Sequence, residues 1–190
     1  MSASEKRVTS DEVASNLKDH IHGKTILITG CSPSSLGAET ARAIATQNPG
    51  LLILAGRSKA AIEETEKNIK EQIPSARTRF LMLDLASLSS VRQAAAKVNA
   101  YAETVDVLIN NAAIMAGPYE LTADGYESQF AVNHLGHFLF TNLLMEKMAR
   151  RGVRVVNVTS NGYGFGGVRW EDPNFMVRLC YLILELMEYY

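Results

Sequence analysis

The chain has 190 residues, of which 47% are hydrophobic and 21% are charged, and its net charge is -1. This length is enough for one domain with a sizeable core, and the near-zero charge gives no electrostatic reason to bind nucleic acid or an anionic membrane. The two cysteines, Cys31 and Cys180, lie far apart and form no CxxC motif, which is typical of a reducing compartment.

The ends of the chain carry no clear targeting signal. The first residues, MSASEKRVTSDEV, are polar and lack the apolar segment of a secretory signal. The most apolar stretch, residues 176–190, is too short to cross a bilayer and contains Arg178, Glu185 and Glu188. We therefore expect a cytoplasmic protein with no membrane span.

The predicted elements alternate between strand and helix. Residues 1–22 are predicted to form a polar arm with one short helix, since Thr9 and Glu12 have the spacing of a capping box. The apolar, strand-like runs that follow are 24–30, 51–56, 79–85, 105–112 and 153–160. The helical segments between them are 36–47, 59–73, 87–101 and 125–151. Strands that are apolar throughout and separated by helices predict an α/β fold with a doubly wound parallel sheet of Rossmann type.

The turn after the first strand, TGCSPSSLG (29–37), has the character of a phosphate-binding loop. Gly30 would permit the tight turn, and Gly37 would let the next helix pack closely while its first amides face a phosphate. The spacing departs from GxGxxG, so an ordinary turn between a strand and a helix is the alternative.

The second strand ends in AGRS (55–58), at the place where such domains contact the adenosine ribose. An acidic residue there would favour NAD, whereas Arg57, with Ser58 beside it, can pair with the 2′-phosphate of NADP. We therefore favour NADP over NAD. A solvated arginine in a surface loop is the alternative.

The third and fourth strands end in LDL (83–85) and NNAA (110–113). Ligands of open α/β sheets bind beyond the carboxyl ends of the strands, so these turns should meet at one crevice. Asp84 could accept a hydrogen bond from the adenine amino group, and the small Ala112 and Ala113 would admit a flat ring.

Taken in order, TGCSPSSLG, LDL, NNAA, VNHLGHFLFTNLL and RVVNVTS make residues from about 24 to 175 resemble the short-chain dehydrogenase/reductase family, and within it the retinol-dehydrogenase-like branch. The resemblance implies an NAD(P)-binding domain over residues 23–175 with about five of the family's seven strands. It also implies a C-terminal truncation after about residue 175, which leaves residues 176–190 as a divergent apolar tail.

The resemblance also implies a set of cofactor contacts. Around the pyrophosphate they are Gly30, Ser35, Leu36 and Gly37, and at the ribose phosphate they are Arg57 and Ser58. At the adenine they are Asp84 and Leu85, and at the nearer ribose they are Asn111 and Ala112. One departure is that Ser35 stands where the family carries a central glycine, in a turn one residue longer. Because serine resists positive φ, we expect this loop to sit differently on the phosphates.

For catalysis, the resemblance implies that Ser160 orients a carbonyl and that Asn133 holds a water in a proton relay. The alternatives are a strand-end turn residue for Ser160 and a buried polar residue bonded to backbone for Asn133. In this family a tyrosine exchanges the proton, and a lysine four residues later lowers its pKa. None of the seven tyrosines in the sequence has lysine at that spacing, and Tyr181 is followed there by Glu185, the wrong charge.

The sequence therefore predicts an NADP-dependent oxidoreductase for a small carbonyl or alcohol substrate, with little or no turnover by these residues. The alternatives are a non-catalytic nucleotide-binding or partner-binding module and an unstable truncated product. The fifth strand would need an oligomer, a partner or the tail to cover its apolar edge. His134 and His137 lie three residues apart, but no third ligand supports a metal site.

Overall fold

The computed structural model describes residues 8–148, 153–167 and 169–176. Within them, one parallel sheet is formed by β1 (Thr25–Thr29), β2 (Leu51–Gly56), β3 (Thr78–Met82), β4 (Val107–Asn110) and β5 (Arg154–Asn157). The strand order is β3-β2-β1-β4-β5. The order reverses between β1 and β4, which confirms the doubly wound α/β fold and marks where a ligand crevice is expected.

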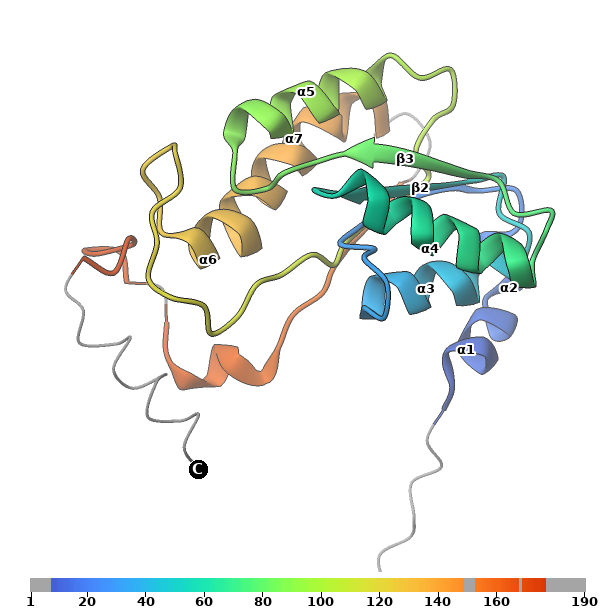
Figure 1. Cartoon of the computed structure of the whole chain (residues 1–190), viewed down its shortest axis with the longest axis horizontal. Coiled ribbons are helices and arrows are strands. Elements are labelled where there is room, and N and C mark those ends of the chain that lie inside the picture. Colours follow the sequence, from blue (N-terminus) through green and yellow to red (C-terminus); the bar gives the residue numbers. More distant parts are fainter. Residues whose placement is uncertain (1–7, 149–152, 168, 177–190) are drawn as a thin grey trace, which may run out of the picture.

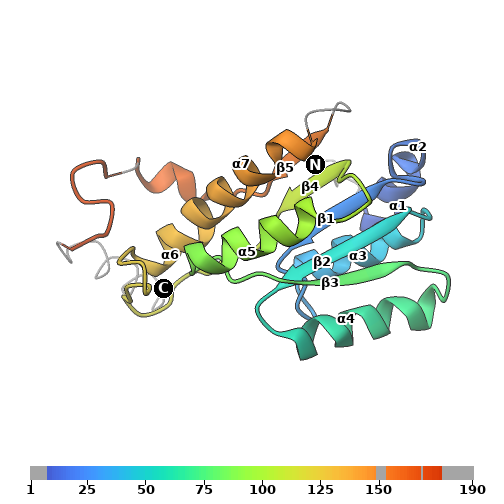
Figure 2. The ribbon, with the colours of Figure 1, turned by 90° about the horizontal axis from the view of Figure 1, so that it is seen from above.

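Helices cover both faces of the sheet (Figure 1). One face carries α3 (Leu36–Ala45) and α4 (Lys59–Gln72), with the short α1 (Ser10–Asn16) and α2 (Lys18–Ile21) beside them. The other face carries α5 (Leu88–Asn99) and α7 (His137–Met148), which run side by side in Figure 2. The crossovers therefore place two helical layers around one buried sheet, as the uniformly apolar strands predict.

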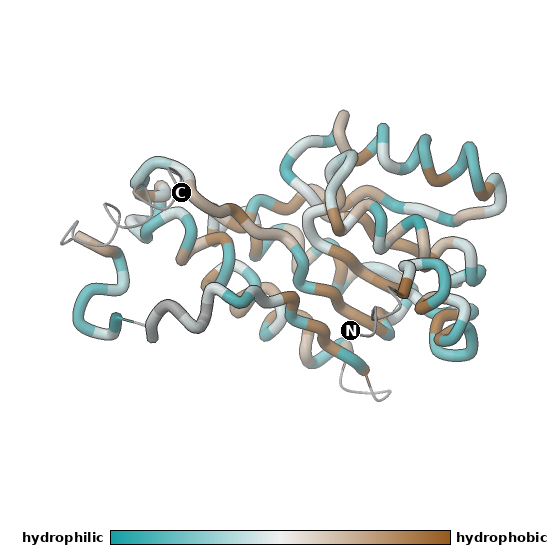
Figure 3. Tube along the Cα trace, turned by 90° about the horizontal axis from the view of Figure 1, so that it is seen from below, coloured by the Kyte–Doolittle hydropathy of each residue, from teal (hydrophilic) through white to brown (hydrophobic). Residues whose placement is uncertain are grey.

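Alternate residues of the central strands β1 and β2 supply two separate cores. Leu27 and Ile53 pack with α5 and α7, whereas Ile28 and Leu54 pack with α3 and α4. All four side chains are fully buried. Figure 3 shows the hydrophobic residues concentrated on strands that run through the middle of the molecule. The sheet is thus held from both sides, and its carboxyl edge is a rigid base for the turns.

Serine caps fix where three helices begin. The hydroxyls of Ser35, Ser58 and Ser87 accept hydrogen bonds from the amides of Ala38, Ala61 and Ser90, respectively, at the starts of α3, α4 and α5. Such caps satisfy one of the amides that a helix start leaves unpaired. The predicted starts of these helices therefore agree with the structure to within one residue.

The long helix predicted over residues 125–151 is helical from residue 128 to 148, but it begins three residues later than predicted and is not a regular α-helix throughout. A short α6 (Ser128–Phe130) leads into a π-helical turn (Ala131–Gly136), and only then does α7 begin. The Asn133 side chain is bonded to the backbone of Ile114, which holds this turn against a neighbouring segment. Residues 149–151 of the prediction lie outside the described part.

The N-terminal segment packs onto the domain from residue 8 onward. It forms two short helices rather than the single predicted one, and the Thr9 hydroxyl caps the first by accepting from the amide of Glu12. Ala14 and Ile21 are buried in the core beneath α3, and Asp11 pairs with Arg42 at 2.9 Å. Of the predicted tail over residues 176–190, all but Met176 lies outside the described residues.

Strand β5 lies at one edge of the sheet, as predicted, and its apolar residues are incompletely covered. Val156 and Val158 keep 38% and 52% of their surface exposed, and Phe138 on α7 keeps 61%. In the part of the chain described, no helix is both long and apolar enough to cross a membrane.

The two-sided burial of the sheet predicts a large cost for truncating a β2 side chain. Ile53→Ala should lower the free energy of unfolding by about 3 kcal/mol, because the fully buried site cannot collapse around the cavity. Lys67→Ala, on the exposed face of α4, should change it by less than about 0.5 kcal/mol. Urea denaturation followed by circular dichroism measures both; equal effects would show that this face of the sheet is not packed as described.

Candidate functional site

A crevice of about 450 Å³ opens at the carboxyl ends of β1, β2, β3 and β4, where the strand order reverses. Nine of the ten cofactor residues predicted from the sequence line it: Gly30, Ser35, Leu36, Arg57, Ser58, Asp84, Leu85, Asn111 and Ala112. The tenth, Gly37, is buried behind them. The structure therefore brings four turns from distant parts of the chain to one place.

Two glycines allow the turn after β1 to approach its neighbours. Gly30 has φ +76°, and a Cβ at this position would come within 2.7 Å of the Cα of Ala112. A Cβ on Gly37 would overlap the carbonyl oxygen of Gly30 and would lie 2.6 Å from Nδ2 of Asn111. The crevice wall is therefore a backbone surface that side chains at these two positions would disrupt.

In this turn the residue with positive φ is Ser34, so Ser35 avoids the backbone conformation that serine resists. Ser34 has φ 61°, while Ser35 has φ −88° and caps α3. The Ser35 hydroxyl also donates to the carbonyl of Gly30 at 3.1 Å, which ties the cap to the start of the turn. The first amides of a helix have no intrahelical acceptor, so those of Leu36 and Gly37 begin α3 as donors suited to an anion.

The end of β2 presents Arg57 and Ser58 on the rim of the crevice. Both residues are exposed, and the Ser58 hydroxyl caps α4 by accepting from the amide of Ala61 at 3.3 Å. The Arg57 side chain extends from the turn just before Ser58, and this cap fixes the position of Ser58. An exposed guanidinium at this position is suited to a phosphate group that reaches the rim.

The end of β3 forms the opposite wall. The carboxylate of Asp84 accepts from the amide of Ala86 at 3.0 Å, and the amide of Asp84 donates to the Ser90 hydroxyl at 3.0 Å. Leu85 is buried and contributes an apolar surface. This wall thus combines a fixed carboxylate with an aliphatic side chain, a combination that can hold the edge and face of a purine-sized ring.

Thr29, the last residue of β1, is a functional residue that the sequence reasoning missed. Its fully buried hydroxyl accepts from the amides of Asn111 and Ala112 at 2.9 and 3.0 Å. The Asn111 side chain in turn donates to the carbonyls of Thr29 and Gly30. The turns after β1 and β4 are therefore joined by four hydrogen bonds. Thr29 is the threonine of the TG pair that opens the first turn, but its contacts lie more than 80 positions away in the sequence.

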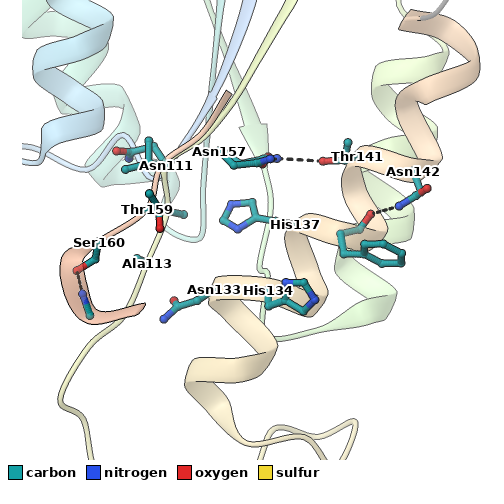
Figure 4. Close-up of a pocket in the computed structure, with 15 residues that line it drawn as sticks. Asn111, Ala113, Asn133, His134, His137, Thr141, Asn142, Asn157, Thr159 and Ser160 are labelled. Atoms are coloured by element: carbon teal, nitrogen blue, oxygen red, sulfur yellow. Dashed lines mark hydrogen bonds between the residues drawn. The ribbon is translucent and has the colours of Figure 1, made fainter. Parts of the chain in front are cut away.

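A second crevice, of about 590 Å³, adjoins the first and contains both residues predicted for catalysis, Asn133 and Ser160. Asn111, Ala112 and Ala113 line both crevices. Figure 4 shows Ser160 on the segment that follows β5, Asn133 on the π-helical turn and Ala113 in the region between them.

Each of these two side chains is engaged with backbone. Asn133 Oδ1 accepts from the amide of Ile114 at 2.9 Å, and its Nδ2 donates to the Ile114 carbonyl at 2.8 Å. The Ser160 hydroxyl accepts from the amide of Gly162 at 3.1 Å and begins a short 3-10 helix (Asn161–Phe165). The hydroxyl proton of Ser160 is not used in that bond and can be donated to an oxygen in the crevice.

His137 lies at the back of the second crevice and is buried, with its Nε2 2.9 Å from the Thr29 hydroxyl oxygen. Burial lowers the pKa of the ring, while a hydrogen bond to the backbone carbonyl of Asn133 acts in the opposite direction. The sequence analysis considered this histidine only as a metal ligand. Among the described residues, no group of three His, Cys, Asp or Glu side chains is placed to hold a metal ion.

The described lining of the second crevice includes no tyrosine and no lysine. Tyr163 belongs to the short 3-10 helix, but its side chain lies outside what the structure describes. Cys31, beside the first crevice, is no substitute acid, because burial raises the pKa of its thiol to about 12. The described lining therefore offers the hydroxyl of Ser160 and the amide of Asn133, without a phenol and ammonium pair.

Comparison with known proteins matches residues 24–170 to the family model described as short chain dehydrogenase. Retinol dehydrogenase 13 of Mus musculus is 42% identical over 162 residues, which cover 85% of this chain and 48% of that protein. Oxidoreductase fscI of Fusarium equiseti is 38% identical, over 88% of this chain and 67% of its own length. The chain thus spans about half the length of the retinol dehydrogenases that it matches.

Solved structures agree with this match. A crystal structure of an uncharacterized protein from Mycobacterium Paratuberculosis is 39% identical, with a TM-score of 0.69, and covers 82% of this chain and 53% of its own. A metagenomic short-chain oxidoreductase in complex with NADP shares the fold at 22% identity, with a TM-score of 0.63, over 74% of this chain and 63% of its own.

The close approach at Gly37 predicts that one added methyl group will disturb the crevice wall. Gly37→Ala should lower the free energy of unfolding by about 1–3 kcal/mol, because the new Cβ overlaps the backbone of Gly30 and the Asn111 amide. Gly117→Ala is the matched control, since a Cβ there meets nothing within 4 Å and should cost less than about 0.5 kcal/mol. Chemical denaturation measures both, and a neutral Gly37→Ala would contradict the described packing.

Proposed function

Because the chain belongs to the short-chain dehydrogenase family and matches retinol dehydrogenases within it, we propose that its first crevice binds NADP. The full activity proposed is that of an oxidoreductase, with hydride transfer between the nicotinamide and a small carbonyl or alcohol substrate. The observation that carries the proposal is the convergence of nine predicted contact residues on one crevice.

The residues present fit the cofactor part by part. The amides of Leu36 and Gly37, at the start of α3, would receive the pyrophosphate. Asp84 and Leu85 would hold the adenine, and the Asn111–Ala112 backbone would lie at the nearer ribose. Gly30 and Gly37 leave room for a close backbone approach that a Cβ would fill. When bound, the dinucleotide would supply or accept the hydride.

Arg57 supports NADP over NAD. It is exposed on the crevice rim at the end of β2, where an acidic residue would instead accept from a ribose hydroxyl. The guanidinium can make paired, charge-assisted hydrogen bonds to a 2′-phosphate, which NAD lacks. Specificity would therefore depend mainly on this one side chain.

Turnover by these 190 residues alone should be low. Ser160 can donate to a substrate oxygen, and Asn133 fixes the neighbouring segment through Ile114. The sequence contains no tyrosine followed four residues later by lysine. A free phenol has a pKa of about 10, so without a nearby cation it is a poor proton-transfer group at neutral pH.

A second candidate is a nucleotide-binding or partner-binding module without catalysis. The edge strand β5, where Val156 keeps 38% of its surface exposed, is the surface that a second copy or another partner would cover. The oxidoreductase and the nucleotide-binding module both require the first crevice to bind a dinucleotide, so cofactor binding tests what these two share.

Binding to NADPH and NADH tests this proposal at Arg57. Arg57→Ala should weaken NADPH binding by about tenfold, the low end for a charge-assisted pair because the side chain is exposed. NADH affinity should change by less than about twofold, since NADH has no 2′-phosphate.

Isothermal titration calorimetry with both nucleotides gives the two dissociation constants. Arg92→Ala, an exposed arginine on α5 outside the crevice, is the charge-matched control and should leave both unchanged. If both variants weakened NADPH binding equally, the effect would be due to net charge and not to a contact of Arg57. No saturable NADPH binding by the unaltered chain would overturn the proposed function.

A further inference from the structure

The ring of His137 joins two parts of the site that are distant in sequence. Its Nε2 lies 2.9 Å from the hydroxyl oxygen of Thr29 at the end of β1, and the backbone of Asn133 in the π-helical turn acts on the ring in the direction that raises its pKa. In Figure 4 the ring projects from its helix toward the side of the pocket where Asn111 and Thr159 are drawn.

Counting donors and acceptors at Thr29 fixes the state of this ring. A hydroxyl has one proton to donate and two lone pairs to accept with. Both acceptor positions are taken, by the amides of Asn111 and Ala112. The remaining contact, to His137, must therefore use the hydroxyl proton, and Nε2 must accept it.

The other ring nitrogen then carries the proton. Because Nε2 accepts, the proton of the neutral ring is on Nδ1. In the π-helical turn the backbone amide of His137 donates to the carbonyl of His134 and not to that of Asn133, the acceptor of a regular α-helix. The buried ring is thus neutral and donates on one side while it accepts on the other.

The same turn holds the far end of the crevice wall. The Asn133 side chain makes two hydrogen bonds to the backbone of Ile114, while Thr29 holds the amides of Asn111 and Ala112. The segment 111–114 is therefore fixed at both ends, by two residues that His137 connects. Residues 111–113 line both crevices, so the position of this segment affects the two together.

We propose that His137 is a positioning residue, which as the neutral Nδ1–H tautomer holds the Thr29 hydroxyl and the π-helical turn so that segment 111–114 is set for the nearer ribose and the substrate. Its effect on cofactor affinity rests on the proposed function. The tautomer and the hydrogen-bond chain do not.

Protonation of the ring would break this chain. A proton on Nε2 removes the acceptor, so the Thr29 hydroxyl would have to rotate and give up an amide. Because burial places the folded-state pKa below 6.5, the ring gains its proton only as the pH falls below that value. Of the described residues, His134 on the same helix is the ionisable group that acts on the ring, whereas Thr29 and the two amides on the sheet side are uncharged.

Nitrogen-15 NMR of the histidine rings in the full chain tests the tautomer without any cofactor. The account predicts a proton on Nδ1 and an unprotonated Nε2 for His137 at pH 7.5. A proton on Nε2 at this pH, or averaged signals typical of a solvated ring, would overturn the proposal whatever the chain binds.

Three variants test the positioning effect with NADP+ calorimetry at pH 7.5. His137→Leu removes both polar atoms, leaves the buried Thr29 proton unpaired and should weaken binding by about tenfold. His137→Gln retains a donor and an acceptor and should recover most of that loss. His134→Gln, three residues away on the exposed side, is the control variant. In an NMR spectrum it should leave the amide chemical shifts of Asn111 and Ala112 unchanged.

The pH profile separates positioning from simple packing. Between pH 7.5 and 5.5 the affinity of the unaltered chain should fall more steeply than that of His137→Gln, and the difference between the profiles cancels the titration of the cofactor's own phosphate. Parallel profiles, or no recovery by His137→Gln in a folded protein, would contradict the proposal. If the unaltered chain binds no NADP+, the proposed function fails, and the NMR result alone decides the tautomer.

Discussion

The hydroxyl of Thr29 is the contact on which the arrangement of both crevices depends. It sits fully buried at the end of the central strand β1, accepts two amides of the segment after β4 and contacts His137 on the helical side. Buried polar groups are costly unless paired, so these bonds must form together when β1 and β4 come into register. The close approach of Gly30 to Ala112 follows from the same junction.

This junction explains why the two halves of the site differ in how they are built. The proposed nucleotide half is mostly backbone, with glycines, helix-start amides and serine caps, and its geometry is set by the sheet. The proposed chemical half consists of side chains such as Asn133 and Ser160 on a π-helical turn and on the segment after an edge strand. The geometry of the first half therefore does not depend on the side chains that the second half needs.

Much of this could be predicted from the sequence, because local patterns determine it. Apolar strands separated by capped helices indicated the sheet, and the rule that ligands meet the carboxyl ends of strands gathered Arg57, Asp84 and Asn111. The π-helical turn was not predicted, and its Asn133 side chain bonds to Ile114, nineteen residues away, a contact that no local pattern reveals. The roles of Thr29 and His137 were missed for the same reason, because their contact joins residues 108 positions apart.

The central claim is that this chain holds a dinucleotide but does not complete the proton transfer. The most direct measurement is NADPH fluorescence on the purified chain, first titrated with nucleotide and then followed over time after a panel of aldehydes and ketones is added. The account predicts saturable binding and a fluorescence that stays constant with every carbonyl compound. Steady, carbonyl-dependent loss of NADPH fluorescence would contradict it and would require a proton donor that these residues do not reveal.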